Sequence, residues 1–187
     1  MMHLSRYKPR IFLSVWAVIF FTASLGSSAL YAEEAGELQV SIDQQVVYCV
    51  ARLHKDEDEF AHFLKDGIAV ATIWNIQVSK SRKYWLNKAI AKIVVIRRAV
   101  PDLLSRSWLL IDETSGISRR VYSLLEVDQF LSGLESFPVL DRSILLDGTP
   151  YQMSVSVIIE HGEINDAWWR TLWQPSNTTL KKEFSLP

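Results

Sequence analysis

The chain has 187 residues, 49% of them hydrophobic and 11% aromatic, and its formal net charge is −1 at pH 7. A charge so close to neutral excludes the strongly basic character that nucleic-acid-binding domains carry. A single cysteine, Cys49, excludes an internal disulfide, so stability has to come from apolar burial.

The first 32 residues have the pattern of an export signal. Its cationic start consists of Arg6, Lys8 and Arg10. The apolar stretch 11–30 follows, and the small residues Ala29 and Ala32 fit two signal peptidase sites. We therefore expect residues 33–187 to be periplasmic. The alternative is an inner-membrane anchor facing the periplasm, because residues 11–30, if uncleaved, have about the length of a spanning helix.

Residues 33–187 are predicted to form a single β-rich domain. These 155 residues are enough for one domain with a sizeable core. They carry 17 Lys and Arg against 21 Asp and Glu, a net charge of −4. We therefore expect no nucleic-acid partner.

The first part of this domain passes from strand to helix and back. Residues 38–42 alternate as a strand, and residues 46–53 resume the pattern as a second strand or as a continuation past a bulge. A helix over residues 56–66 begins with a capping-box-like acidic pair and ends before Gly67, which favours a left-handed stop. Residues 68–78 return to period two and predict a long strand.

Three further strand patterns follow the long strand, over residues 86–98, 108–111 and 117–124. Pro101-Asp102 and Thr114-Ser115-Gly116 separate them, and we expect both segments to interrupt the strands. Strands that are neighbours in sequence usually pair, so this part of the chain predicts a four-strand meander.

The next segments predict a second short helix and a hairpin. Residues 126–134 have apolar side chains at helical spacing before Pro138. Asp147-Gly148 is a hairpin turn signal that would join a strand over residues 143–146 to one over 151–160.

The chain closes with an expected edge strand over residues 180–186, whose lysines discourage further pairing. Strands dominate, and two short helices are inserted between antiparallel runs. The sequence therefore predicts a mainly β (α+β) fold, an antiparallel β-sandwich-like domain or a strongly curved sheet.

Three stretches carry a family resemblance. They are the helix exit LKDGIAV at residues 64–70, the basic aromatic link Arg82-Lys83-Tyr84-Trp85, and the late strand from Tyr151 with its Trp-containing tail. Most of residues 38–187 thereby resembles a family of exported Gram-negative proteins called domain of unknown function 4390. The resemblance implies an envelope protein without an established activity. It also implies a gene context beside a membrane sensor kinase, which makes such a kinase a candidate partner.

The titratable residues lack the spacing of a catalytic or metal site. Residues 55–59 gather four carboxylates that could bind a divalent cation, but acidic residues also favour a helix start, and the central Gly of a calcium loop is missing. The histidines lack ligand spacing, and no Gly-x-Ser-x-Gly elbow occurs. Cys49 alternates with apolar residues, which favours a buried thiol over a nucleophile. We expect no catalytic residue, no metal and no cofactor.

Two aromatic groups are candidate interaction surfaces. Arg82, Lys83, Tyr84 and Trp85 could stack on a sugar or sit at an anionic lipid headgroup, and the structural alternative is a solvated hairpin rim with one buried aromatic anchor. Trp168, Trp169 and Trp173 could cover an open end of the sandwich or form a partner-binding patch.

The function that we expect is that of a non-catalytic envelope protein. Its domain would bind a protein partner, such as a membrane-associated sensor kinase, through strand edges or the Trp-rich end. The alternative is a module that holds a lipid or another small ligand in a cavity between its sheets. An unrecognised enzyme is the third hypothesis.

Overall fold

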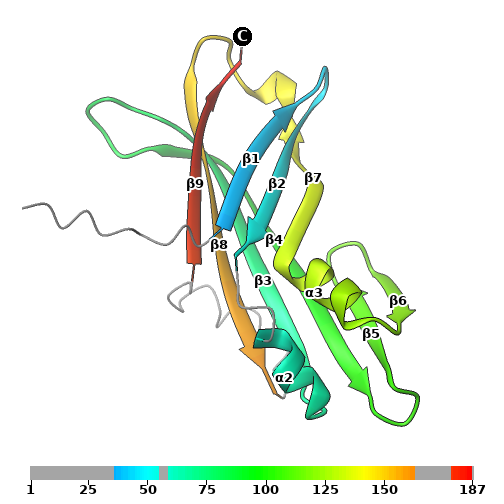
Figure 1. Cartoon of the computed structure of the whole chain (residues 1–187). Coiled ribbons are helices and arrows are strands. Elements are labelled where there is room, and N and C mark those ends of the chain that lie inside the picture. Colours follow the sequence, from blue (N-terminus) through cyan, green and yellow to red (C-terminus); the bar gives the residue numbers. More distant parts are fainter. Residues whose placement is uncertain (1–35, 55–58, 163–177, 187) are drawn as a thin grey trace, which may run out of the picture. The chain divides into compact units, whose positions relative to one another are not determined.

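The computed structural model describes residues 36–54, 59–162 and 178–186. These residues form two antiparallel β-sheets, of three and six strands, and two short α-helices (Figure 1). The prediction of a mainly β, sandwich-like domain with two inserted helices is confirmed. In this part of the chain, no helix combines the length and the apolar character that crossing a bilayer requires.

The three-stranded sheet begins with a hairpin of β1 (Gly36–Ile42) and β2 (Val46–Leu53), which matches the predicted pair of strands. In the turn, the Asp43 carboxylate accepts hydrogen bonds from the backbone N–H groups of Gln45 at 2.8 Å and Val46 at 2.6 Å. The third strand, β7 (Gly133–Asp141), pairs with the other edge of β2. The sequence did not predict this strand.

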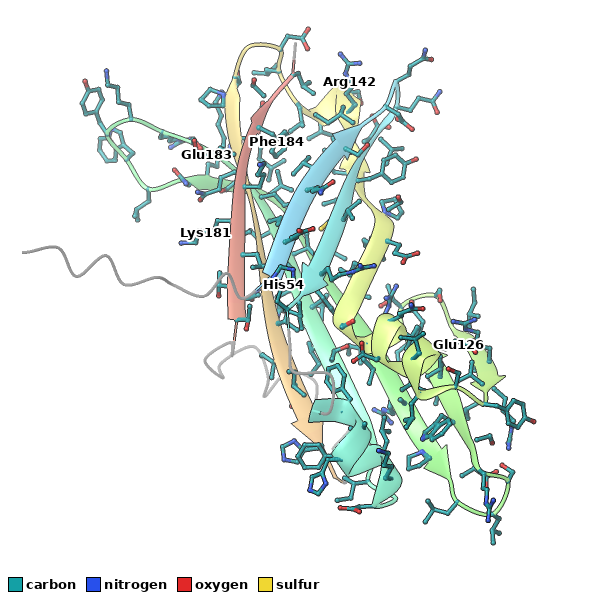
Figure 2. All side chains as sticks on the ribbon, viewed as in Figure 1. His54, Glu126, Arg142, Lys181, Glu183 and Phe184 are labelled. Carbon is teal, nitrogen blue, oxygen red and sulfur yellow. The ribbon has the colours of Figure 1, made fainter. Side chains whose placement is uncertain are left out.

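The six-stranded sheet contains the predicted meander. Its order is β6-β5-β4-β3-β8-β9. The strands are β3 (Val70–Lys80), β4 (Lys88–Asp102), β5 (Ser107–Asp112), β6 (Ile117–Val121), β8 (Pro150–His161) and β9 (Thr178–Ser185). The last strand, β9, lies at an edge of this sheet, as expected. Figure 2 shows Lys181 and Glu183 on its outer side, whereas the Phe184 ring packs 5.8 Å from the Tyr151 ring.

The two helices are α2 (Glu59–Lys65) and α3 (Leu124–Ser132). Gly67 ends α2 with φ +80°, its N–H donates to Leu64 O at 3.3 Å, and the Ile68 N–H donates to Phe63 O at 2.9 Å. These two bonds form a Schellman motif, so the predicted left-handed stop is confirmed. The acidic start expected at residues 55–58 lies outside the described residues.

The inner face of the six-stranded sheet carries two cores. Over one half of this face, strands of both sheets form an apolar cluster in which Trp74, Val155 and Cys49 are fully buried. Over the other half, α2 and α3 pack on the sheet through residues such as Leu64 and Leu131. The even-numbered side chains of β3 reach both clusters, so this strand joins the two cores.

Pro101-Asp102 does not break the chain, which corrects the prediction, because both residues belong to β4 and pair with Trp108 and Ser107. The Glu113 N–H donates to Ile96 O, so the backbone N–H and C=O groups of even-numbered residues in β4 point towards β5. In odd-numbered residues these groups point towards β3. The backbone nitrogen of Pro101 therefore lies on the β3 side, where pairing ends at Ala99. The missing N–H of proline therefore costs no ladder bond.

Residues 143–146 do not form the predicted strand, and the expected hairpin is absent from this part of the described chain. Instead, Arg142–Ile144 is a 3-10 turn whose first N–H groups are capped by Asp141, since its carboxylate accepts from the Ser143 N–H at 2.8 Å. A local side-chain bond of this kind competes with strand pairing. β7 escaped prediction because its Pro138 resembles a helix stop, whereas an edge strand tolerates proline.

Candidate functional site

The turn between β3 and β4 is the first candidate surface. Residues 81–87, which we call the hairpin tip, project away from the two sheets beyond β9 (Figure 1). At the base of the tip, the Ser81 N–H donates to Pro150 O at 3.0 Å, and the Asn87 side-chain amide lies 3.4 Å from the Gln152 amide oxygen. Both bonds tie the tip to β8, so its base is fixed.

The aromatic side chains of the hairpin tip face solvent. Tyr84 is 82% exposed, Trp85 79% and Leu86 92%. The Lys83 ammonium lies 5.7 Å from the centre of the Tyr84 ring. Neither aromatic residue is the buried anchor that the structural alternative expected, so burial in the domain does not explain this run.

The charged residues of segment 70–101, which contains the hairpin tip, all carry positive charge. Those in and beside the tip are Lys80, Arg82, Lys83, Lys88 and Lys92. No Asp or Glu occurs between Asp66 and Asp102. The tip therefore combines an exposed aromatic and aliphatic run with several cations, and the carboxylate of Glu183 lies beside its base, since Glu183 pairs with Gln152, the partner of Asn87.

The second candidate surface lies where α2, α3 and the β4–β5 turn meet. Two hollows of about 350 Å³ and about 310 Å³ share Leu64, Lys65 and Leu124 as lining residues, and we call them together the α2–α3 groove. Two exposed apolar side chains lie at its rim, since Leu103 is 62% exposed and Leu125 66%. Leu104, in the same turn as Leu103, is fully exposed.

The charged groups at the rim of the groove differ in their partners. Asp102 is held by the Arg120 guanidinium at 2.8 Å. The Ser105 hydroxyl, followed by Arg120 and the Ser105 N–H, lowers the pKa of Asp102 to about 2. Lys65 and Arg106, both exposed, make no ion pair within the described ranges. The lining of the groove thus combines apolar side chains with two cations, Lys65 and Arg106, and two carboxylates, Asp102 and Asp128.

Sequence reasoning missed this groove, because its walls come from three separate segments. One local signal was present, since Leu103-Leu104 is an apolar pair inside an otherwise polar turn. An exposed apolar pair in a turn contributes nothing to the core and is a mark of an interaction site.

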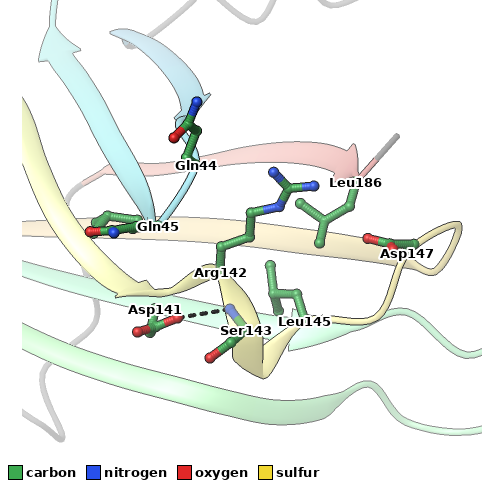
Figure 3. Close-up of a pocket in the computed structure, with 9 residues that line it drawn as sticks. Gln44, Gln45, Asp141, Arg142, Ser143, Leu145, Asp147 and Leu186 are labelled. Carbon is green, nitrogen blue, oxygen red and sulfur yellow. Dashed lines mark hydrogen bonds between the residues drawn. The ribbon is translucent and has the colours of Figure 1, made fainter.

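A polar hollow of about 720 Å³ lies near the β1–β2 turn (Figure 3). The Arg142 N–H donates to Gln45 O at 2.7 Å, and the Arg142 side chain extends past Gln44 towards Leu186. The Ser143 hydroxyl and N–H lower the pKa of Asp141. These bonds join the 3-10 turn to the β1–β2 turn, so they have a structural explanation.

The thiol and the imidazoles differ in their surroundings. Burial raises the pKa of the Cys49 thiol to about 12, in line with the expected buried thiol. The His161 ring stacks on Phe63 with 4.3 Å between ring centres, and His62 lies 3.8 Å from Asp66. Over the described stretches, no three His, Cys, Asp or Glu residues gather where they could hold a metal.

Trp168, Trp169 and Trp173 lie outside the described residues, as does the predicted export signal. Whether these tryptophans cover the sandwich or form a patch stays a prediction. The same holds for cleavage after Ala29 or Ala32.

The comparison with protein families gives one match. The family model described as Domain of unknown function (DUF4390) matches residues 34–164. The chain belongs to the DUF4390 family. The resemblance inferred from residues 64–70, 82–85 and the strand from Tyr151 is thereby confirmed.

The match to DUF4390 extends over both helices and β1 to β8, and it includes the hairpin tip and the α2–α3 groove. Comparison with curated proteins and with solved structures gives no match. Because the DUF4390 description carries no activity, the function of this member has to be argued from its own surfaces.

Proposed function

We propose that this DUF4390 chain is an exported, non-catalytic envelope protein that binds a partner protein in the α2–α3 groove. The observation that carries the proposal is the pair of adjoining hollows around Leu64 and Leu124 with exposed Leu103 and Leu125 in their lining. Contiguous exposed apolar surface of this kind marks interaction sites on soluble domains.

The lining of the groove defines the chemistry of the partner. Hollows of about 350 Å³ and about 310 Å³ suit a few apolar side chains of one segment, as in the docking of an amphipathic helix. Lys65 and Arg106 line the hollows without an ion pair in the described ranges, whereas the lining carboxylate of Asp102 is paired with Arg120, and Asp128 lines the hollow on the α2 side. We therefore expect an apolar segment that carries acidic side chains next to its anchors.

The export signal supports a periplasmic partner. Residues 1–32 carry the three cations, the apolar run and the small residues of such a signal. A membrane-associated protein, such as the sensor kinase implied by the family resemblance, meets this requirement. An uncleaved segment 11–30 would hold the domain at the inner membrane with the groove still on the periplasmic side.

The inter-sheet core gives less support to a lipid or small-ligand module. Such a module needs space between the sheets, but Trp74, Tyr151 and Met153 are almost fully buried there in one apolar cluster. An enzyme also has less support, since Cys49 is buried as a neutral thiol. A small molecule recovered by mass spectrometry from the purified protein would favour the ligand-binding module.

Site-specific crosslinking tests the groove. A photoreactive amino acid is placed at Leu103 or at Leu125, and at Ile144 as the control, since Ile144 is 57% exposed on the 3-10 turn outside the groove. The expected result in envelope preparations is one protein that crosslinks from both groove positions and not from Ile144. Crosslinking that is equally strong from all three positions contradicts the proposal.

The protein found in this way is then purified and titrated with the full chain. The double variant Leu103→Glu/Leu125→Glu places negative charge opposite an acidic partner segment and removes two apolar contacts, so we expect at least about a tenfold weaker Kd. Both residues are exposed, so the melting temperature should not change. An unchanged Kd shows that the groove is not the binding site.

A further inference from the structure

We infer that the hairpin tip, residues 81–87, docks on the surface of an anionic phospholipid bilayer. The inference does not depend on the proposed partner in the α2–α3 groove. It is carried by the exposure, the residue types and the charge of one turn.

Three consecutive apolar or amphipathic side chains form the end of the tip. Tyr84, Trp85 and Leu86 are each about four-fifths exposed or more, at 82%, 79% and 92%. Tyrosine and tryptophan prefer the headgroup level of a bilayer, because the ring is apolar while its polar atom stays hydrated. Leu86 extends the same run, so the end of the tip matches the interface between headgroups and acyl chains.

The charge beside these side chains matches an anionic surface. Arg82, Lys83 and Lys88 are exposed and flank the run on both sides. Lys80 and Lys92 add two more cations further down the strands. Cations near an anionic leaflet are attracted within about a Debye length, so the ends of both strands contribute to docking.

Hydrogen bonds fix the backbone of the tip. The Arg82 N–H donates to the Asn87 side-chain oxygen at 3.3 Å across the turn, and Ser81 and Asn87 are bonded to β8 as described above. A fixed turn loses little backbone entropy on docking. The aromatic side chains are thus presented in advance on a stable strand pair.

The position of the tip is compatible with a free groove. The tip follows the last residue of β3, whereas α2 precedes its first residue. The 11 residues of β3 span roughly 33 Å. Docking of the tip would therefore leave the α2–α3 groove at the far end of the sheet, away from the bilayer.

A single reactive cysteine at the tip gives a direct test. Cys49 is fully buried, so Leu86→Cys in the full chain can be labelled selectively with an environment-sensitive fluorophore. The matched control is Leu104→Cys, equally exposed and at the other end of β4. Both proteins are added to vesicles with equal parts of phosphatidylglycerol and phosphatidylcholine, and any insertion through residues 11–30 is the same for both.

The expected result is a blue shift of the fluorophore at position 86 and none at position 104. No shift at position 86, or an equal shift at both positions, overturns the inference. An equal shift with pure phosphatidylcholine overturns the requirement for anionic lipid. A shift that needs an added envelope protein identifies the tip as a protein contact and overturns membrane docking.

Charge removal completes the test. The triple variant Arg82→Gln/Lys83→Gln/Lys88→Gln should lower the ratio of docked to undocked tip about 100-fold, which removes the blue shift. The control triple variant Lys65→Gln/Arg106→Gln/Arg119→Gln removes the same amount of charge outside the tip. It should keep the blue shift. All six side chains are exposed, so equal melting temperatures are expected. Equal blue shifts of the two triple variants contradict the inference.

Discussion

The carboxylate of Asp102 organises the β4–β5 turn next to the proposed groove. It accepts from the Ser105 N–H at 3.1 Å and from the Arg120 guanidinium at 2.8 Å. The same Arg120 nitrogen lies 2.9 Å from the Ser107 hydroxyl. Leu103 and Leu104 lie inside the loop that these bonds close, so the network fixes the apolar rim of the groove.

The lowered pKa of Asp102 predicts a specific pH dependence. Its pKa is about 2 in the folded protein, against an ordinary value of 3.8, so its contribution to stability is present above about pH 4. This contribution is lost as the pH falls through about 2. We expect the melting temperature of wild type to exceed that of Asp102→Asn by a constant amount above about pH 4. The difference should shrink below that pH.

Thermal melts at a series of pH values measure this difference. The control Asp147→Asn removes an exposed carboxylate from another turn and should show a small difference from wild type. A difference for Asp102→Asn that does not change between neutral and strongly acidic pH would show that the charged network is not formed in solution.

At the scale of elements, Arg97 connects the six-stranded sheet to the end of α3. Its guanidinium donates to Phe130 O at 3.0 Å and to Gly133 O, and it lies 4.9 Å from the centre of the Phe130 ring. The side chain is 15% exposed and pairs with Asp112 at 3.7 Å. The last carbonyl groups of a helix lack partners within the helix, and Arg97 supplies donors to two carbonyls at this end.

Replacing Arg97 should destabilise the domain. Arg97→Met keeps apolar volume but leaves the Phe130 and Gly133 carbonyls without these donors, so we expect a loss of about 2–3 kcal/mol. Urea unfolding measures it. Arg119→Met is the control, because that side chain is 59% exposed in its ion pair with Glu126 and should cost less than about 1 kcal/mol. Equal losses for the two variants would contradict the role of Arg97.

Local sequence patterns predicted those elements whose signal lies within the element. β1 and β3 follow from alternation, the rest of the meander follows from apolar runs separated by turn signals, and the stop at Gly67 follows from its left-handed backbone. The signal for β7 is not local, because this edge strand is defined by pairing with β2, as in Leu134 with Ala51. The 3-10 turn depends on one hydrogen bond of Asp141, which alternation cannot reveal.

The two candidate surfaces also differ in whether their residues are neighbours in the sequence. The hairpin tip is continuous in sequence, so Arg82, Lys83, Tyr84 and Trp85 could be selected from composition alone. Their exposure was a prediction that needed the structure, since a buried aromatic anchor fitted the pattern equally well. The α2–α3 groove is formed by residues far apart in the chain, and only the fold brings them together.

At the scale of the whole described domain, one sheet supports two cores of unequal size. The cluster between the sheets contains 19 buried residues, whereas the cluster under the helices contains 8. Burial of apolar side chains is the main favourable term in folding, so the helical part has the smaller share of this stabilisation. We therefore expect the proposed groove to lie in the less stable part of the domain, where binding of a partner would order its surroundings.

Hydrogen exchange should reveal this difference. Amide protons of α3, such as that of Val127, which donates to Ser123 O at 3.3 Å, should exchange at least about tenfold faster than those of Trp74 and Val155 in the central strands. The measurement is native-state exchange followed by NMR. The added partner should slow exchange in α3 and leave the central strands unchanged, because it binds over the smaller core. Equal exchange rates in α3 and in the central strands would mean that the helices unfold only together with the sheet. The groove would then be a preformed, rigid binding site.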